Sequence, residues 1–193
     1  MNTFRINAVA VAIGLAFSAG AMAQGMSKDQ YNAGKGSIAA EYKSAKAACG
    51  SFSGNAKDIC MAEAGGREKV AKAELDAAYK PSVDASYKVR LARAGADYAV
   101  AREKCDDKAG NVKDVCVKQA KSAEIAAKAD AKAQMKTAKA TNTANEKVTD
   151  ARKDAASDKL DADFAVAKEK CDAFAGDAKS KCVNDAKARF GKQ

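Results

Sequence analysis

Apolar residues recur at intervals of four, three and four along three segments of the chain, and each segment ends at a cysteine. This spacing places the residues on one face of an α-helix, with the cysteine on the buried side. We interpret the aromatic residue of each stripe as part of the core, because it shares the register of the cysteine; the alternative is a ligand-binding aromatic. The stripes are Ile38-Tyr42-Ala45-Cys49, Ala94-Tyr98-Ala101-Cys105 and Leu160-Phe164-Ala167-Cys171.

A glycine, a polar residue and a second cysteine follow each stripe at the same spacing. The glycine can adopt the left-handed conformation that ends a helix. The next residue, Asn or Asp, can accept hydrogen bonds from the free N–H groups of a new helix. Each segment therefore predicts two antiparallel helices with one cysteine on each arm. The three sets are Gly54-Asn55 with Cys60, Gly110-Asn111 with Cys116, and Gly176-Asp177 with Cys182.

The cysteines predict three disulfides, Cys49–Cys60, Cys105–Cys116 and Cys171–Cys182. Closing so short a loop stabilises a fold by about 2–3 kcal/mol in the chain-entropy model. Other disulfide pairings and a metal or redox role are the alternatives. Zinc sites use closer pairs of cysteines or add histidine, and this chain contains no histidine. We therefore predict no metal and no cofactor.

Residues 1–23 have the pattern of a cleavable signal peptide. Arg5 supplies a positive charge, residues 8–17 are apolar, and Ala21-Met22-Ala23 matches a cleavage site. A retained membrane anchor is the alternative, but the apolar run is short and ends at the cleavage motif. We expect no transmembrane anchor after cleavage. Paired cysteines also fit export, and we predict a bacterial periplasmic protein.

Large aliphatic residues are scarce in this chain. After removal of the signal peptide, Leu, Ile, Val and Phe number 20 of 170 residues, or about 12%. Alanine and lysine replace them, and both favour helices. The predicted fold is all-α: an extended array of about six helices, arranged as three disulfide-stapled hairpins with coiled-coil-like packing and a thin core.

The predicted boundaries follow the glycines, the single proline and the polar stretches. Glycines at 25, 34 and 36 predict a flexible segment over 24–36, and Gly65-Gly66 predicts a bend. Pro81 ends a helix. The charge-free stretch 141–145 predicts a loop, with Thr143 and Glu146 as a capping box. The hairpin repeats then span 37–80, 82–140 and 144–193.

The sequence predicts no catalytic residues and no small-molecule substrate. Histidine is absent, and the carboxylates are scattered among lysines as on a solvated helix face. Gly34-Lys35-Gly36-Ser37 lacks the spacing and the preceding strand of a phosphate-binding loop. The net charge is +9, but interspersed acidic residues disfavour a dense nucleic-acid-binding surface. The expected partners are an envelope protein or an anionic envelope polymer, and the lysines could equally serve only solubility.

The second and third segments share Cys-Asp-x3-Gly-Asn/Asp-x-Lys-x-x-Cys, beginning at Cys105 and Cys171, whereas Gly50 follows Cys49 in the first. Together with the signal and the Ala/Lys-rich helices, this motif resembles uncharacterised exported proteobacterial proteins, often labelled TolA-like cell-envelope-biogenesis proteins. The resemblance implies an envelope setting. It does not extend to a retained anchor or a C-terminal globular domain like those of TolA.

Three functions compete at this point. The leading hypothesis is a non-enzymatic structural or interaction module of the cell envelope, with self-association possible. The alternatives are a holdase chaperone similar to the basic helical periplasmic chaperone Skp, and a nonspecific binder of anionic envelope polymers or nucleic acid.

Overall fold

The computed structural model describes residues 25–192, and within this range it contains helices and no strands. The predicted signal peptide lies outside the described residues. The helices are α1 (Lys28–Ala48), α2 (Gly54–Tyr79), α3 (Val83–Cys105), α4 (Gly110–Lys170) and α5 (Gly176–Phe190). Two short 3-10 turns, η1 (Cys49–Ser51) and η2 (Cys171–Ala173), follow α1 and α4.

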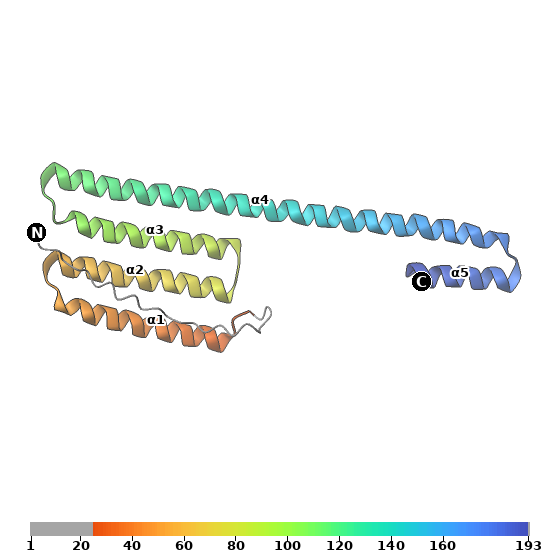
Figure 1. Cartoon of the computed structure of the whole chain (residues 1–193), viewed down its shortest axis with the longest axis horizontal. Coiled ribbons are helices and arrows are strands. Elements are labelled where there is room, and N and C mark those ends of the chain that lie inside the picture. The colour runs from red at the N-terminus through yellow and green to blue at the C-terminus, as the bar shows by residue number, and fades with distance from the viewer. Residues whose placement is uncertain (1–24, 193) are drawn as a thin grey trace, which may run out of the picture.

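Helices α1 to α4 form a single flat layer of antiparallel neighbours (Figure 1). In the described part of the chain, α1 contacts α2, α2 contacts α3 and α3 contacts α4, with no contact between helices further apart in this series. No other described helix therefore covers either face of the layer. The extended all-α array of disulfide-stapled hairpins predicted from the sequence is confirmed.

Helix α4 is 61 residues long and continues far beyond the layer (Figure 1). Helix α5 folds back against its distant end. An ion pair from Lys139 to Asp84 marks the edge of the layer, and one from Lys192 to Asp161 marks the end of the α5 contact. Between these two points, α4 has no neighbouring helix among the described residues.

The prediction of a flexible segment over 24–36 is wrong for the part that the structure describes as helical, because α1 begins at Lys28. Ser27 and Gln30 form a capping box, each accepting a hydrogen bond from the backbone N–H of the other. Gly34 does not interrupt this helix. A Cβ atom at Gly34 would lie 2.7 Å from Cδ1 of Leu75, so the glycine allows α1 to approach α2 closely.

The predicted Asn and Asp caps are also wrong. The residues before α2, α4 and α5 are Ser53, Ala109 and Ala175, and none makes a side-chain capping hydrogen bond. Each loop instead turns at the predicted glycine, which has a positive φ and begins the next helix: Gly54 at 55°, Gly110 at 53° and Gly176 at 59°. This left-handed geometry favours glycine over any residue with a side chain.

Gly65-Gly66 produces no break, because α2 runs through it from Gly54 to Tyr79. Gly66 is buried against α3, where a Cβ atom would lie only 2.9 Å from the Cβ of Ala96. Gly66 therefore allows α2 and α3 to pack closely. The sequence pattern had instead predicted a bend at this position.

The loop predicted over 141–145 is helical, and Thr143 and Glu146 do not begin a new helix. Neither Gly nor Pro occurs between Gly110 and Gly176, so nothing in this stretch forces the backbone out of helical geometry. Thr149 donates its hydroxyl to the carbonyl of Asn145, within the helix. The described residues thus form five α-helices, one fewer than predicted.

The core is thin. Its buried apolar residues are cysteines and alanines: Cys49, Ala64, Ala94, Cys105, Ala120, Ala131, Cys171 and Ala186. Because alanine buries little area, each helix contact contributes little hydrophobic free energy. Close approach at small residues and covalent closure of the loops must therefore carry much of the stability.

The two adjacent glycines of α2 provide a matched test of close packing. We expect Gly65→Ala to stabilise the protein by up to about 1 kcal/mol, because alanine has the higher helix propensity and a Cβ there meets nothing within 4 Å. Gly66→Ala should lower the melting midpoint, because its Cβ collides with Ala96. Thermal melts followed by circular dichroism compare the two; equal stabilisation by both changes would contradict this packing.

Candidate functional site

The structure closes all three predicted disulfides and leaves no free cysteine. The Cα–Cα distances are 5.6 Å for Cys49–Cys60, 5.6 Å for Cys105–Cys116 and 5.7 Å for Cys171–Cys182. The first cysteine of each pair is fully buried, while the second is half-buried on the facing arm. The paired cysteines form covalent cross-links between helices and are not positioned as metal ligands.

Two of the three loops also contain an ion pair. Lys113 lies 2.8 Å from Asp106, and Lys179 lies 2.8 Å from Asp172, at equivalent positions of the second and third hairpins. The hydrogen bond from lysine is the main cause that lowers the pKa of each aspartate below its usual value. In the first hairpin Gly50 replaces this aspartate, so that loop lacks the pair.

The aromatic residues of the three stripes pack against the neighbouring arm and are half-buried. Lys121 of α4 lies over the ring of Tyr98, with its Nζ 4.9 Å from the ring centre. The ring of Phe164 meets that of Phe190 edge-on, with the centres 6.2 Å apart. These positions fit the core interpretation, since each aromatic residue is placed at a helix–helix contact.

Glu124 is the one buried charged residue among those described, and sequence reasoning did not identify it. Its carboxylate pairs with Lys121 at 2.7 Å and with Lys128 at 2.6 Å. Hydrogen bonds from these two lysines lower the pKa of Glu124. The cluster joins α4 to Tyr98 of α3 through Lys121, so it stabilises the same contact as the central disulfide.

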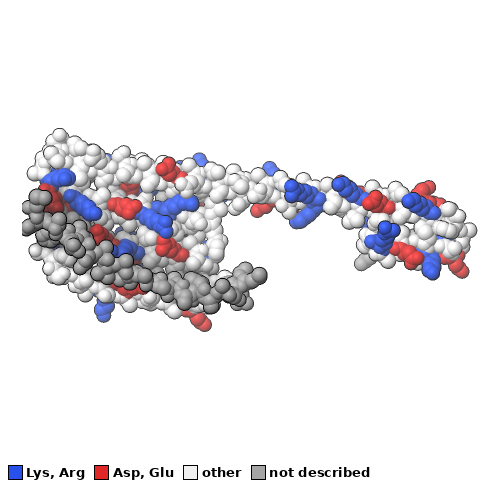
Figure 2. Space-filling model, viewed as in Figure 1, with Lys and Arg blue, Asp and Glu red and all other residues white. Residues whose placement is uncertain are grey.

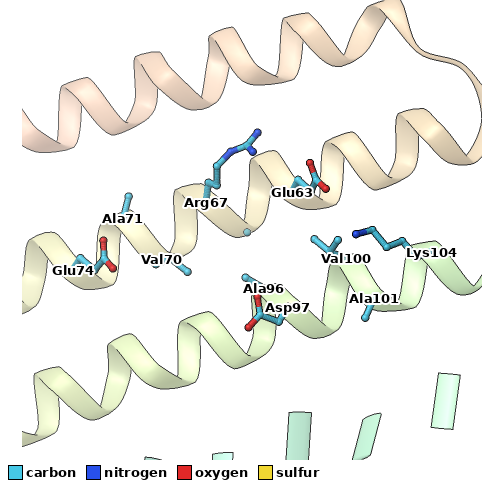
Figure 3. Close-up of a pocket in the computed structure, with 11 residues that line it drawn as sticks. Glu63, Arg67, Val70, Ala71, Glu74, Ala96, Asp97, Val100, Ala101 and Lys104 are labelled. Carbon is cyan, nitrogen blue, oxygen red and sulfur yellow. The ribbon is translucent and has the colours of Figure 1, made fainter. Parts of the chain in front are cut away.

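A groove of about 620 Å³ lies between α2 and α3. Figure 3 shows Val70 and Ala96 directed into the space between the two helices, with Glu63 and Lys104 toward one end. The groove exists because Gly66 and Ala96 bring the helices together at its base. It is lined by Glu63, Gly66, Arg67, Val70, Ala71, Glu74, Ala96, Asp97, Val100, Ala101 and Lys104.

The groove offers a shallow apolar floor with charges of both signs at its rim. This combination suits contact with an amphipathic peptide better than a small charged molecule, because no set of like charges converges on one point. Within residues 25–192, no group of three or more His, Cys, Asp or Glu side chains could hold a metal ion. In the same range, no helix has the length and apolar character required to cross a membrane.

Charged side chains of both signs alternate over the face in Figure 2, across the four-helix layer and along α4. The part of this face that the described residues show has no continuous basic patch. The net charge of +9 is therefore distributed and not gathered into one surface there.

Comparison with protein-family models, with curated proteins and with solved structures finds no match for this chain.

The disulfides provide a prediction about local and global stability. Replacing Cys105 and Cys116 by serine should destabilise the layer by about 2–3 kcal/mol, because the loop joins two of its four helices. The same change at Cys171 and Cys182 should release only α5, which contacts α4 and η2 alone. Melts followed by circular dichroism should show a lowered main transition for the first variant and an additional early transition for the second. Equal effects on the main transition would contradict this assignment.

The Asp106–Lys113 pair predicts a pH-dependent contribution. Because the folded pKa of Asp106 is lowered, the stabilisation is present above the unfolded pKa and is lost as the pH falls through the folded pKa. Asp106→Asn should therefore lower the melting midpoint slightly at neutral pH and have no effect in strong acid. Asp107→Asn is the control, because Asp107 is the next residue and its carboxylate forms no ion pair in the described structure. A difference that persists in strong acid would exclude this ion pair as its cause.

Proposed function

We propose that this chain is an exported, non-enzymatic structural or interaction protein of the bacterial cell envelope. The observation that carries the proposal is the closure of every cysteine into a short-range disulfide. Such cross-links form and persist in oxidising compartments and are rare in reducing ones. The signal-like residues 1–23 support the same setting independently.

The shape of the molecule suits a spacer with two ends. Helix α4 has 61 residues, and at 1.5 Å per residue it extends about 90 Å. One end carries the four-helix layer and the other carries α5. A disulfide-closed loop lies at each end of α4, so these two cross-links are separated by the length of the helix. Such an arrangement holds two binding surfaces at a fixed separation without any catalytic group.

Export and oxidation can be tested together. The protein should be recovered from the periplasm of a Gram-negative host, starting at Gln24, and its mass should increase on alkylation only after reduction. A variant without residues 1–23 is the matched control and should stay in the cytoplasm. Recovery of the full-length chain from the cytoplasm, or free thiols in exported protein, would contradict the proposal.

A second candidate is a holdase chaperone, and the groove between α2 and α3 supports it. Its apolar floor and mixed charges could hold an unfolded segment of an outer-membrane protein. Under this alternative, the protein suppresses aggregation of such a substrate in moderate salt, and Val70→Glu in the groove weakens the effect. Phe174→Glu, at an exposed position in the loop before α5, is the control. Absence of suppression would eliminate the chaperone function and leave the structural one.

The net charge supports only a weaker third candidate, nonspecific binding of anionic envelope polymers or nucleic acid. Binding of this kind depends on released counterions and falls steeply with salt.

A further inference from the structure

The side of α4 that faces away from α3 carries an exposed apolar strip along the whole helix. Ala126 and Ala133 each follow a buried residue, Glu124 and Ala131, by two positions, which places them on the opposite side of the helix. Every member of the strip is exposed. Val166, near the far end of the strip, also lines a pocket beside α5. We define the outer strip as Val112, Val115, Ala126, Ala133, Ala144, Val148, Ala151, Ala162 and Val166.

The register of the strip is regular. Val148 and Val166 are 18 residues apart, and Val112 and Val148 are 36 apart, so they lie about five and ten turns along the same line. Asp130 interrupts this line midway between Val112 and Val148. The valines are well exposed: Val112 by 64%, Val115 by 46%, Val148 by 49% and Val166 by 55%. Valines repeated in line on a solvent-facing helix surface indicate a surface that packs against another helix.

Charges along one edge of the strip change sign near the middle of α4. Lys118, Lys136 and Asp154 each follow a strip residue by three positions, so they occupy the same edge. Lys132 and Asp150 lie one turn before Lys136 and Asp154. Asp158 and Asp161 continue the acidic part of this edge. The first half of the edge is thus mainly basic and the second half mainly acidic.

The composition of α4 shows the same reversal. Residues 118–139 contain six lysines and two carboxylates, a net charge of +4, whereas residues 146–163 contain four basic and six acidic residues, a net charge of −2. The helix runs from Gly110 to Lys170, so its midpoint is residue 140. The net charge of α4 therefore changes sign close to the midpoint of the helix.

We propose that the outer strip of α4 binds the outer strip of a second copy of this chain, with the two helices antiparallel and the two-fold axis close to Thr141. In this alignment both helices overlap over their full length. Lys132 is level with Asp150 of the second copy, since both are nine residues from 141. Three further oppositely charged pairs are level on the same count: Lys136 with Glu146, Asp130 with Arg152, and Asp114 with Lys168.

A parallel pair would place like charges level with one another, so it is disfavoured. A one-residue shift of the antiparallel register in one direction places Lys113 level with Lys168. A shift in the other direction places Lys136 level with Lys147 and Asp114 level with Glu169. Glu124 with Asp158 is a like-charged pair in the proposed register, but Glu124 faces inward and is neutralised by Lys121 and Lys128. The complementarity is therefore specific for one register and for a partner with the same sequence.

The geometry of the monomer leaves room for this partner. Helices α3 and α5 both contact the other side of α4, so neither obstructs the strip. Lys118, Lys132, Lys136, Asp154 and Asp158 have no ion pair among the described residues. Their charges are available to a second copy, and alanines along the strip allow the two backbones to approach closely.

Charge reversal tests this interface. The first variant is Lys132→Glu with Lys136→Glu, and the second is Glu146→Lys with Asp150→Lys, which reverses the two residues that are level with them. Sedimentation equilibrium of the mature disulfide-bonded protein at low salt should show a dimer for the natural sequence. By two-fold symmetry each variant reverses four level pairs, so its self-association should be on the order of a hundredfold weaker. An equimolar mixture of the two variants should dimerise again.

The control is Lys57→Glu with Lys69→Glu, which changes the net charge equally but lies on α2, and it should leave the dimer unchanged. Circular dichroism should show all variants to be equally helical. A monomeric natural protein at low salt would overturn the proposal, as would dimerisation that the variants do not weaken. A mixture that remains monomeric would also overturn it.

Discussion

The disulfide between the two arms of each hairpin is the interaction on which this structure depends. A layer of four helices with alanine and cysteine as its buried residues has little apolar area to hold it together. Most small domains fold with a net stability of only about 5–15 kcal/mol. Three short loops, each closed at about 2–3 kcal/mol, supply a comparable amount. Without them the conformational entropy of so extended a chain would oppose the fold with little to offset it.

The same constraint explains the flat shape. Small residues let helices lie close together, as Gly34 does beside Leu75 and Gly66 beside Ala96. They do not provide the wide apolar face that a second layer of helices would need. Among residues 25–192, each helix therefore meets only its sequence neighbours, and the longest one, α4, projects without a neighbouring helix between the layer and α5. An exposed strip on α4 that matches a second copy would give this long helix the neighbour that its own chain does not provide.

The sequence predicted the features that recur three times and missed those that depend on tertiary context. Repeated spacing was enough to pair Cys105 with Cys116 and to place the turn at Gly110. The caps assigned to Asn55, Asn111 and Asp177 failed, because the turning glycine is itself the first helical residue. Gly34 and Gly66 looked like points of flexibility, since a helical pattern does not reveal what lies opposite a missing side chain. Stretch 141–145 looked like a loop from its polarity, although it contains no residue that breaks a helix. Neither the groove between α2 and α3 nor the buried Glu124 could be derived from spacing within one helix.

Unfolding of the oxidised and reduced protein by urea tests the central claim most directly, namely that cross-links and not the core hold the layer together. Circular dichroism would follow the mature chain with its disulfides intact, and then after reduction and blocking of all six cysteines. The account predicts a cooperative transition for the oxidised protein and its loss, or a shift to far lower urea concentration, after reduction. Superimposable transitions in the two states would show that alanine packing alone stabilises the layer, and would contradict the account.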